Sequence, residues 1–205
     1  MIPNTTFATG VIMLGAGASL RMGRPKLLLP WRDTTVIGHL IRQWRELGVA
    51  QLAIVLRADD QQLLAELERL GLAQENCIIN PEPGRGMFSS IICAASWPGW
   101  RRDISCWAIV LGDQPHLQTE SLRRLLEYSA SHPQAICQPA TTMCVGHPVL
   151  LPRRAFEELK STPAATLKEF LNLTVIPRVQ CPVNEAGLAL DLDTPEDYKQ
   201  LIAIN

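Results

Sequence analysis

The stretch from Leu14 to Lys26, LGAGASLRMGRPK, combines glycines with positively charged side chains. Gly15 and Gly17 allow the backbone to approach an anion closely, and successive N–H groups in such a loop can surround phosphate oxygens. Arg21 and Lys26 supply the positive charge that several phosphates require. The pattern therefore favours a polyphosphate-binding loop, with a structural turn carrying surface arginines as the alternative.

Two common glycine motifs fit this loop poorly. A P-loop ends in Gly-Lys followed by Ser or Thr, but here Pro25 precedes Lys26 and Leu27 follows it. The dinucleotide fingerprint G-x-G-x-x-G would begin at Gly15, but Leu20 stands where its third glycine is required. The loop therefore matches neither class.

Carboxylates at two distant places form the second candidate group. Asp113 stands in Leu111–Pro115, LGDQP, directly after an apolar run, and the carboxyl end of a parallel strand is where such sheets bind ligands. Asp191 and Asp193 lie two residues apart in LDLDTPED and would share one side of a strand. Carboxylates suit Mg²⁺, which is held by one or two of them together with substrate phosphates. For each aspartate, a role in a turn or a helix cap is the alternative.

Short apolar runs alternate with helical patterns along most of the chain. Strands are predicted at Val11–Leu14, Leu52–Leu56, Cys77–Ile79 and Cys106–Leu111. Helices are predicted over Thr35–Leu47, Asp59–Leu70 and Ser89–Ser96, after a cap at Thr119, and after a cap at Thr194 with Pro195 in the first turn. This alternation predicts an α/β fold with a mostly parallel sheet covered by helices on both faces. We expect a single domain over residues 1–205.

The loop sequence resembles a known family. From Leu14 to Pro30 it follows the pattern L-x-A-G-x-S-x-R-M-G-x-x-K-x-L-L-P of nucleotidyltransferases, most closely the branch that contains molybdenum cofactor cytidylyltransferase. The guanylyltransferase branch usually has L-A-G-G at Leu14–Gly17, so Ala16 favours the cytidylyl branch, although Gly15 replaces its usual alanine. The resemblance implies a doubly wound, Rossmann-like sheet of the nucleotide-diphospho-sugar transferase type.

The resemblance also implies roles for residues. It makes Lys26, Arg21 and Asp113 catalytic, and Asp113 a metal ligand together with Asp191 or Asp193, of which Asp193 is favoured. It implies nucleotide binding by Leu14, Gly15, Ala16, Gly17, Ser19, Arg21, Met22, Gly23, Lys26, Asn80, Gly86, Ser89, Ser90 and Asp113.

A third motif is expected near the second substrate. Gly146–Val149, GHPV, resembles a segment of the same branch, and we expect Gly146, His147 and Pro148 to bind the acceptor. His147 is not assigned as a base, because a lone histidine is more often a hydrogen-bonded structural residue. Family members commonly carry a G-D-x-G-A type loop further on, whereas this chain has Ser161–Leu167, STPAATL, which leaves the acceptor open.

The resemblance implies Mg²⁺-dependent transfer of CMP from CTP to the phosphate of a molybdopterin-type acceptor, with release of pyrophosphate. The alternatives within the class are a molybdenum cofactor guanylyltransferase, a cytidylyltransferase for a sugar or polyol phosphate, and a sugar-1-phosphate nucleotidyltransferase. Outside enzymology, the alternative is a nucleotide-binding maturation factor for a molybdenum hydroxylase. Such a hydroxylase, or its own maturation factor, is also an expected partner.

Composition narrows the possible partners. The 205 residues include 19 basic and 20 acidic side chains, for a net charge of -1, which argues against nucleic-acid binding or a polybasic membrane surface. The six cysteines contain no C-x-x-C pair and are expected to be reduced thiols of a cytoplasmic protein. Trp97 and Trp100 are expected in the core or at its rim.

Overall fold

A computed structural model of the protein describes residues 7–203. Its main sheet has the strand order β5-β4-β1-β6-β8-β7-β9, and only β8 runs against its neighbours. Its strands are β1 (Ala8–Leu14), β4 (Gln51–Arg57), β5 (Cys77–Asn80), β6 (Ile104–Leu111), β7 (Ile136–Ala140), β8 (Val149–Pro152) and β9 (Arg178–Pro182). A separate two-stranded antiparallel hairpin is formed by β2 (Pro30–Trp31) and β3 (Thr34–Thr35). The expected mostly parallel sheet is confirmed.

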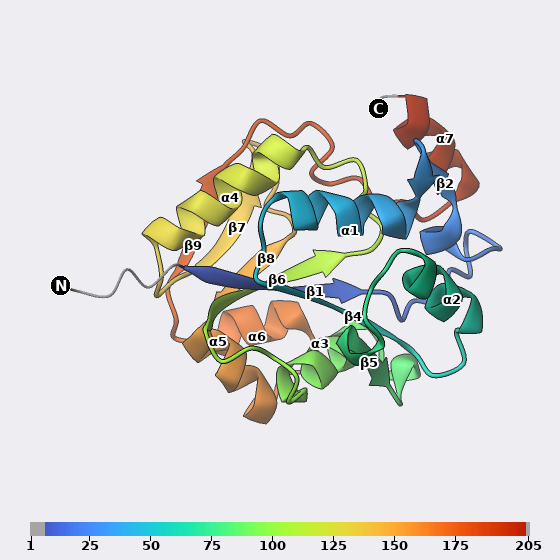
Figure 1. Ribbon diagram of the computed structural model, residues 1–205. Coiled ribbons are helices and arrows are strands. Elements are labelled where there is room, and N and C mark those ends of the chain that lie inside the picture. Colours follow the sequence, from blue (N-terminus) through green and yellow to red (C-terminus); the bar gives the residue numbers. More distant parts are fainter. Residues whose placement is uncertain (1–6, 204–205) are drawn as a thin grey trace.

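Helices cover both faces of this sheet (Figure 1). On one face lie α1 (Val36–Glu46) and α4 (Thr119–Ser131), and on the other lie α3 (Met87–Ser96), α5 (Arg153–Glu158) and α6 (Leu167–Leu173). Two further helices, α2 (Gln61–Arg69) and α7 (Pro195–Ala203), contribute side chains to the same apolar core as α1. Single turns of 3-10 helix occur at Lys26–Leu28, Gln74–Asn76, Pro83–Arg85 and Leu159–Ser161. No helix in the described part of the chain is long and apolar enough to cross a membrane.

The side-chain alternation of the strands divides the apolar core in two. In β1, Val11 and Met13 enter the core beneath α1, whereas Ile12 enters the core beneath α3, and all three are fully buried. Each such side chain contributes about 1.5–3 kcal/mol by leaving water. In the second core the rings of Trp107 and Phe156 stack 4.0 Å apart. The central strands are thus held from both sides, which keeps their ends in fixed positions.

Most helices begin close to the residues predicted from the sequence. Thr35 caps α1 by accepting from the Gly38 N–H at 3.1 Å, and α7 begins after Thr194 as expected. The expected cap at Thr119 is wrong: α4 begins at Thr119 itself, and the threonine hydroxyl accepts from Gln43 Nε2 at 3.2 Å. The Thr119 hydroxyl oxygen, which the local pattern predicted to cap α4, therefore bonds to Gln43 on α1 instead.

The order of the strands places a ligand edge in the middle of the sheet. The chain leaves β1 for β4 and β5 on one side, and then returns to β6 on the other side of β1. At such a reversal the connections diverge to opposite faces, which opens a crevice at the carboxyl ends of the two central strands. The glycine loop follows β1 and Asp113 follows β6, so both lie at this crevice.

Candidate active site

A pocket of about 520 Å³ lies at the carboxyl ends of β1 and β6. The Gly15 N–H donates to the Val55 carbonyl at 2.8 Å, so the neighbouring strand β4 holds the start of the glycine loop. Of the residues predicted to bind nucleotide, those that line the pocket are Leu14, Gly15, Ala16, Gly17, Ser19, Lys26, Gly86, Ser90 and Asp113. Gly112 also lines it, and a Cβ there would lie 2.9 Å from the Leu14 carbonyl oxygen, so the close approach of β1 and β6 requires glycine.

The far part of the loop folds back on itself. The N–H groups of Met22 and Gly23 donate to the Ser19 carbonyl at 3.1 and 3.2 Å, and the Ser19 hydroxyl accepts from the Lys26 N–H at 3.2 Å. Met22 is only 4% exposed and belongs to the core. Met22 therefore anchors the loop from below, and neither it nor Gly23 is among the residues that line the pocket.

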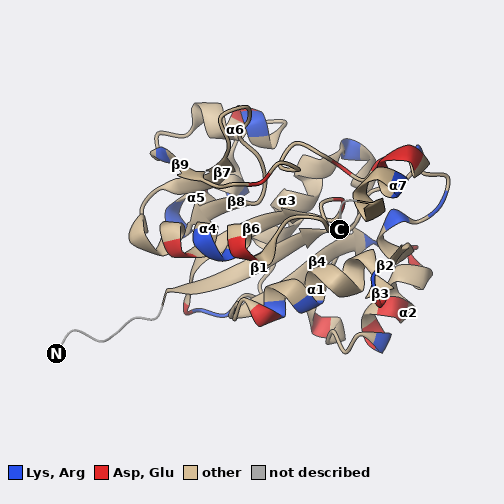
Figure 2. Ribbon diagram, turned by 90° about the horizontal axis from the view of Figure 1, so that it is seen from above, with Lys and Arg blue, Asp and Glu red and all other residues tan. Residues whose placement is uncertain are grey.

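Three distant segments meet at the ammonium group of Lys26. Its Nζ lies 2.7 Å from Asp113 Oδ2 and 3.2 Å from Asp193 Oδ1, and Arg21 donates to Asp193 Oδ2 at 2.6 Å. The Lys26 and Asp113 side chains are 16% and 21% exposed, whereas Arg21 is 71% exposed. Figure 2 shows the same proximity at the level of elements, with acidic ribbon at the start of α7 near a loop that carries basic residues. The charges that the sequence separates are thus paired in the fold.

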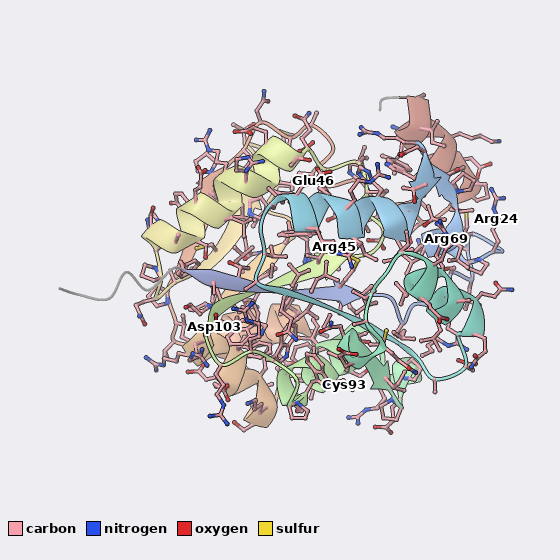
Figure 3. The ribbon with its side chains drawn as sticks, in the orientation of Figure 1. Arg24, Arg45, Glu46, Arg69, Cys93 and Asp103 are labelled. Carbon is pink, nitrogen blue, oxygen red and sulfur yellow. The ribbon has the colours of Figure 1, made fainter. Side chains whose placement is uncertain are left out.

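Arg24, the third cation of the loop, is directed elsewhere. Its guanidinium lies 5.9 Å from the ring centroid of Tyr198 on α7, and it does not line the pocket. Figure 3 shows Arg24 at the outer edge of the molecule, between α7 and α2 in that view. Of the three loop cations, Arg21 and Lys26 therefore face the aspartates, and Arg24 fastens the loop to α7.

The third aspartate lies beside the other two. Asp191 Oδ1 accepts from Gln114 Nε2 at 3.0 Å. Burial and the nearby Asp113 carboxylate raise the pKa of Asp191 above its usual range. A divalent cation fits this arrangement, because Asp113 Oδ1 is buried with no hydrogen-bond partner and Lys26 joins the Asp113 and Asp193 carboxylates. No group of three or more His, Cys, Asp or Glu side chains within residues 7–203 forms a complete metal site, so phosphate oxygens would have to supply further ligands.

A set of hydrogen bonds holds the segment that carries Asp191 and Asp193 against the residues that follow β6. The Leu192 N–H donates to the Asp113 carbonyl at 2.8 Å, and His116 Nε2 lies 2.9 Å from the Gly187 carbonyl. Glu185, 4% exposed, accepts from the Gln118 N–H at 2.9 Å. Sequence reasoning missed these contacts. The only signal for them was that His116 and Gln118 come shortly after the LGDQP motif.

The segment after β5 is organised by Asn80. This buried side chain donates to the hydroxyls of Ser89 and Ser90 at 2.8 and 3.0 Å and accepts from the Glu82 N–H at 2.9 Å. Gly86, with a φ of 89°, precedes α3, which begins two residues earlier than predicted. Asn80 and Ser89 are thus used in shaping the loop and do not line the pocket, whereas Gly86 and Ser90 do.

Arg57 is a pocket residue that sequence reasoning missed. It ends β4, lines the same pocket as the glycine loop and donates through Nε and a terminal nitrogen to Asp59, at 3.0 and 2.8 Å. Its position at the carboxyl end of a predicted strand was the available signal.

A second pocket, of about 650 Å³, adjoins the first at Met87, which lines both. Gly146 and His147 line the second pocket and Pro148 does not. Burial lowers the pKa of His147, and its Nδ1 is buried without a partner. Thr166 and Leu167, from the stretch in which the chain departs from the family pattern, also line this pocket.

The chain is similar to several known proteins. The chain is 26% identical over 193 residues to molybdenum cofactor cytidylyltransferase of Escherichia coli K12, covering 93% of this chain and 94% of that one. It is 34% identical over 119 residues to nicotine blue oxidoreductase of Paenarthrobacter nicotinovorans, covering 58% and 55%. It is 27% identical to a manganese complex of Rv0371C from Mycobacterium tuberculosis H37Rv, with a TM-score of 0.72 and coverage of 97% and 99%.

The family model described as MobA-like NTP transferase domain matches residues 11–177. That span includes the glycine loop, Lys26, Asp113 and the GHP segment. Since the model covers most of the chain and the fold brings these residues to the ligand edge of the sheet, the chain belongs to the family of MobA-like NTP transferase domains.

Proposed function

We propose that this single-domain nucleotidyltransferase transfers CMP from CTP to the phosphate of a molybdopterin-type acceptor, with Mg²⁺ as its cofactor. The observation that carries the proposal is the contact of Lys26 Nζ with both Asp113 and Asp193 at the mouth of the glycine-loop pocket. A cation and two carboxylates at the end of a phosphate-binding loop form the charge pattern that a metal-bound triphosphate requires.

Each group has a role in this chemistry. The loop N–H groups and Arg21 hold the triphosphate, and Lys26 stabilises the charge that develops at the α-phosphate. An acceptor phosphate is already ionised near neutral pH, so it attacks without a dedicated base. Holding the two phosphates in line is therefore the main contribution of the protein.

The carboxylates would hold the metal. Asp113, with its buried unpartnered Oδ1, and Asp193 are the proposed ligands, with Asp191 beside them. When bound, Mg²⁺ neutralises phosphate charge and fixes the triphosphate. With a cation held by these carboxylates, Lys26 would be available to the phosphates.

The choice of CTP rests on two features of the chain. Ala16 stands where the guanylyltransferase branch usually has glycine, and the cytidylyltransferase relative matches over almost the whole chain. A thermal-shift panel with CTP, GTP, ATP and UTP in Mg²⁺ tests this choice. We expect the largest shift with CTP, and a larger shift with GTP would contradict it.

Turnover separates an enzyme from a nucleotide-binding maturation factor. We expect Mg²⁺-dependent release of pyrophosphate from CTP when molybdopterin is added, and none with CTP alone. A protein that binds CTP but releases no pyrophosphate with molybdopterin, sugar phosphates or polyol phosphates would be a maturation factor instead.

A redox role is the second candidate, and the 34% identical oxidoreductase relative favours it. The test is oxidation of NADH or NADPH by the purified protein in the presence of a quinonoid dye. We expect no dye-dependent oxidation, since the ion pairs of Lys26 with Asp113 and Asp193 at the ligand edge suit a metal-bound triphosphate. Dye-dependent oxidation that survives Asp113→Asn would favour the redox role.

A further inference from the structure

The pocket next to the nucleotide pocket has an uneven charge. Two cations, Lys168 and Arg178, line it, and no aspartate or glutamate is among its described lining residues. Neither cation lines the nucleotide pocket. In a chain with nearly equal numbers of acids and bases, such a pocket favours a negatively charged ligand.

The two cations are available to a ligand. Lys168 lies on α6 and Arg178 begins β9, so the fold brings them together from separate elements. Within the described part of the chain, neither side chain makes a hydrogen bond or an ion pair. By contrast, Lys160, which lies in the 3-10 turn before α6, is paired with Glu157 at 2.5 Å. An unpaired lysine and arginine at one concave surface are arranged as a binding site for an anion.

Amide side chains lie beside these cations. Gln138 and Gln180 face each other in the parallel register of β7 and β9, and Asn172 comes from α6. Gln138 Nε2 already donates to the Gly146 carbonyl at 3.3 Å, which fixes the side chain and leaves its oxygen available. Amides present both donors and acceptors, so they match a ligand with a hydrogen-bonding ring edge. A pocket of about 650 Å³ is large enough for such a ring system.

The second pocket adjoins the pocket that Lys26 and Asp113 line. Met87 lines both pockets, and His147, which lines the second, is close enough to Asp113 for the aspartate charge to affect its pKa. α3, which begins with Met87, and α6 lie on the same face of the sheet (Figure 1). A molecule in the second pocket can therefore present one end to the nucleotide.

We propose that Lys168 and Arg178 bind an anionic group of the acceptor that is distinct from the phosphate joined to the nucleotide. This inference rests on the proposed nucleotidyl transfer. The reacting phosphate must lie near Lys26 and Asp113, which line the first pocket, so the cations of the second pocket serve another charge on the same molecule. The acceptor class is then a phosphorylated, hydrogen-bonding ring system with a second anionic group, and a polyol phosphate with one charged end is a poor substrate.

The first experiment measures binding without turnover. Lys168→Gln, Arg178→Gln and the double variant are compared with Lys160→Gln as the matched surface-lysine control. Molybdopterin is the probe, since its dithiolene group is anionic at a distance from its phosphate, and erythritol phosphate is the comparator with one charged end. We expect each single variant to bind molybdopterin about 10-fold more weakly and the double variant more weakly still. CTP binding and erythritol phosphate binding should stay as in the wild type.

The second experiment measures turnover. In the double variant we expect the KM for molybdopterin to rise while kcat with saturating acceptor and the KM for CTP stay near wild type. Lys168→Arg should retain most of the affinity, because it keeps the charge.

The outcomes distinguish this inference from the proposed function. Equal molybdopterin affinity in the wild type and the double variant overturns the anion site, as does equal loss of affinity for erythritol phosphate. Molybdopterin binding that depends on Lys168 and Arg178, without pyrophosphate release, keeps the anion site and overturns the nucleotidyl transfer.

Discussion

At the scale of single residues, Lys26 is the centre of the candidate site. Its ammonium group contacts Asp113 and Asp193, which are separated from it by 87 and 167 positions in the sequence. In the proposed reaction the same ammonium group also serves phosphate oxygens. A lysine suits this exchange because its ammonium group is a compact point charge on a flexible stem.

Lys26→Ala and Asp113→Ala should each lower the rate of pyrophosphate release by at least ~100-fold, because each removes a charge that acts in the transition state. Lys160→Ala, at an exposed lysine outside both pockets, is the control and should keep wild-type turnover. Circular dichroism checks that the variants are folded. Near-wild-type turnover in either variant would contradict the assignment.

The two C-terminal aspartates should differ in their effect on metal use. Asp193 faces Lys26 and Arg21, whereas Asp191 is held by Gln114. We expect Asp193→Asn to raise the Mg²⁺ concentration for half-maximal activity by at least ~10-fold, and Asp191→Asn to raise it less, because a proposed ligand loses its charge only in the first. A titration with Mg²⁺ and with Mn²⁺ measures both. The reverse order would transfer the ligand role to Asp191.

At the scale of elements, the site depends on how the segment before α7 is held against the segment after β6. Residues 113–118 and 185–192 are joined by side-chain and main-chain hydrogen bonds. Asp197 then accepts from Thr194 at 2.8 Å, which fixes the first turn of α7 next to Asp193. Asp191 and Asp193, the aspartates next to the proposed metal site, are therefore positioned by contacts that lie outside the pocket.

His116→Ala tests this positioning. Losing the contact with the Gly187 carbonyl should lower the free energy of unfolding by about 1–3 kcal/mol, since a buried carbonyl is left without its partner. It should also raise the Mg²⁺ requirement, while the affinity for CTP without metal stays unchanged. His132→Ala is the matched control, because this histidine bonds the Tyr128 carbonyl on its own helix, away from the site. A stability loss with an unchanged Mg²⁺ requirement would make His116 purely structural.

At the scale of the whole molecule, burial in the core raises the pKa of cysteine thiols. The structure has free thiols at Cys77, Cys93, Cys106, Cys137, Cys144 and Cys181. Burial raises the pKa of Cys106 to about 12 and that of Cys137 to about 11. Both side chains lie in the core beneath α4, and Ser129 on α4 contacts Cys106 at 3.5 Å. These thiols therefore stay protonated in the folded protein at neutral pH and do not act as nucleophiles.

These raised pKa values imply a pH dependence of stability. The folded state keeps protons on Cys106 and Cys137 that the unfolded state releases above about pH 8.5, so the free energy of unfolding falls as pH rises from there toward pH 11. The slope approaches about 1.4 kcal/mol per pH unit for each thiol. Urea titrations at pH 7, 8.5, 9.5 and 10.5 measure it, and Cys106→Ala with Cys137→Ala should flatten the slope. An unchanged slope in the double variant would mean that titratable groups other than these two thiols cause the loss of stability at high pH.

Much of the fold could be predicted from local patterns. Apolar runs predicted β1, β4, β5 and β6 but not the short hairpin of β2 and β3, and caps such as Thr35 set helix starts, because these signals act within a few residues. The elements after β6 were harder to predict from the sequence, because short strands joined by proline-rich turns give weak hydrophobic periodicity. The antiparallel β8 and the edge strand β9, which carries Arg178, depend on pairing partners that lie far away in the sequence.

The amino-acid sequence was enough to indicate the possible chemistry, because the glycine loop, LGDQP and DLDTPED are contiguous motifs whose residue types favour phosphate and metal binding. Which of these charges meet depends on the fold. Sheet order brings Asp113 and Asp193 to Lys26 and leaves Arg24 on Tyr198. It also joins Lys168 and Arg178 in one pocket. The reason is that strand pairing and core packing are long-range interactions, and they fix distances that no local pattern encodes.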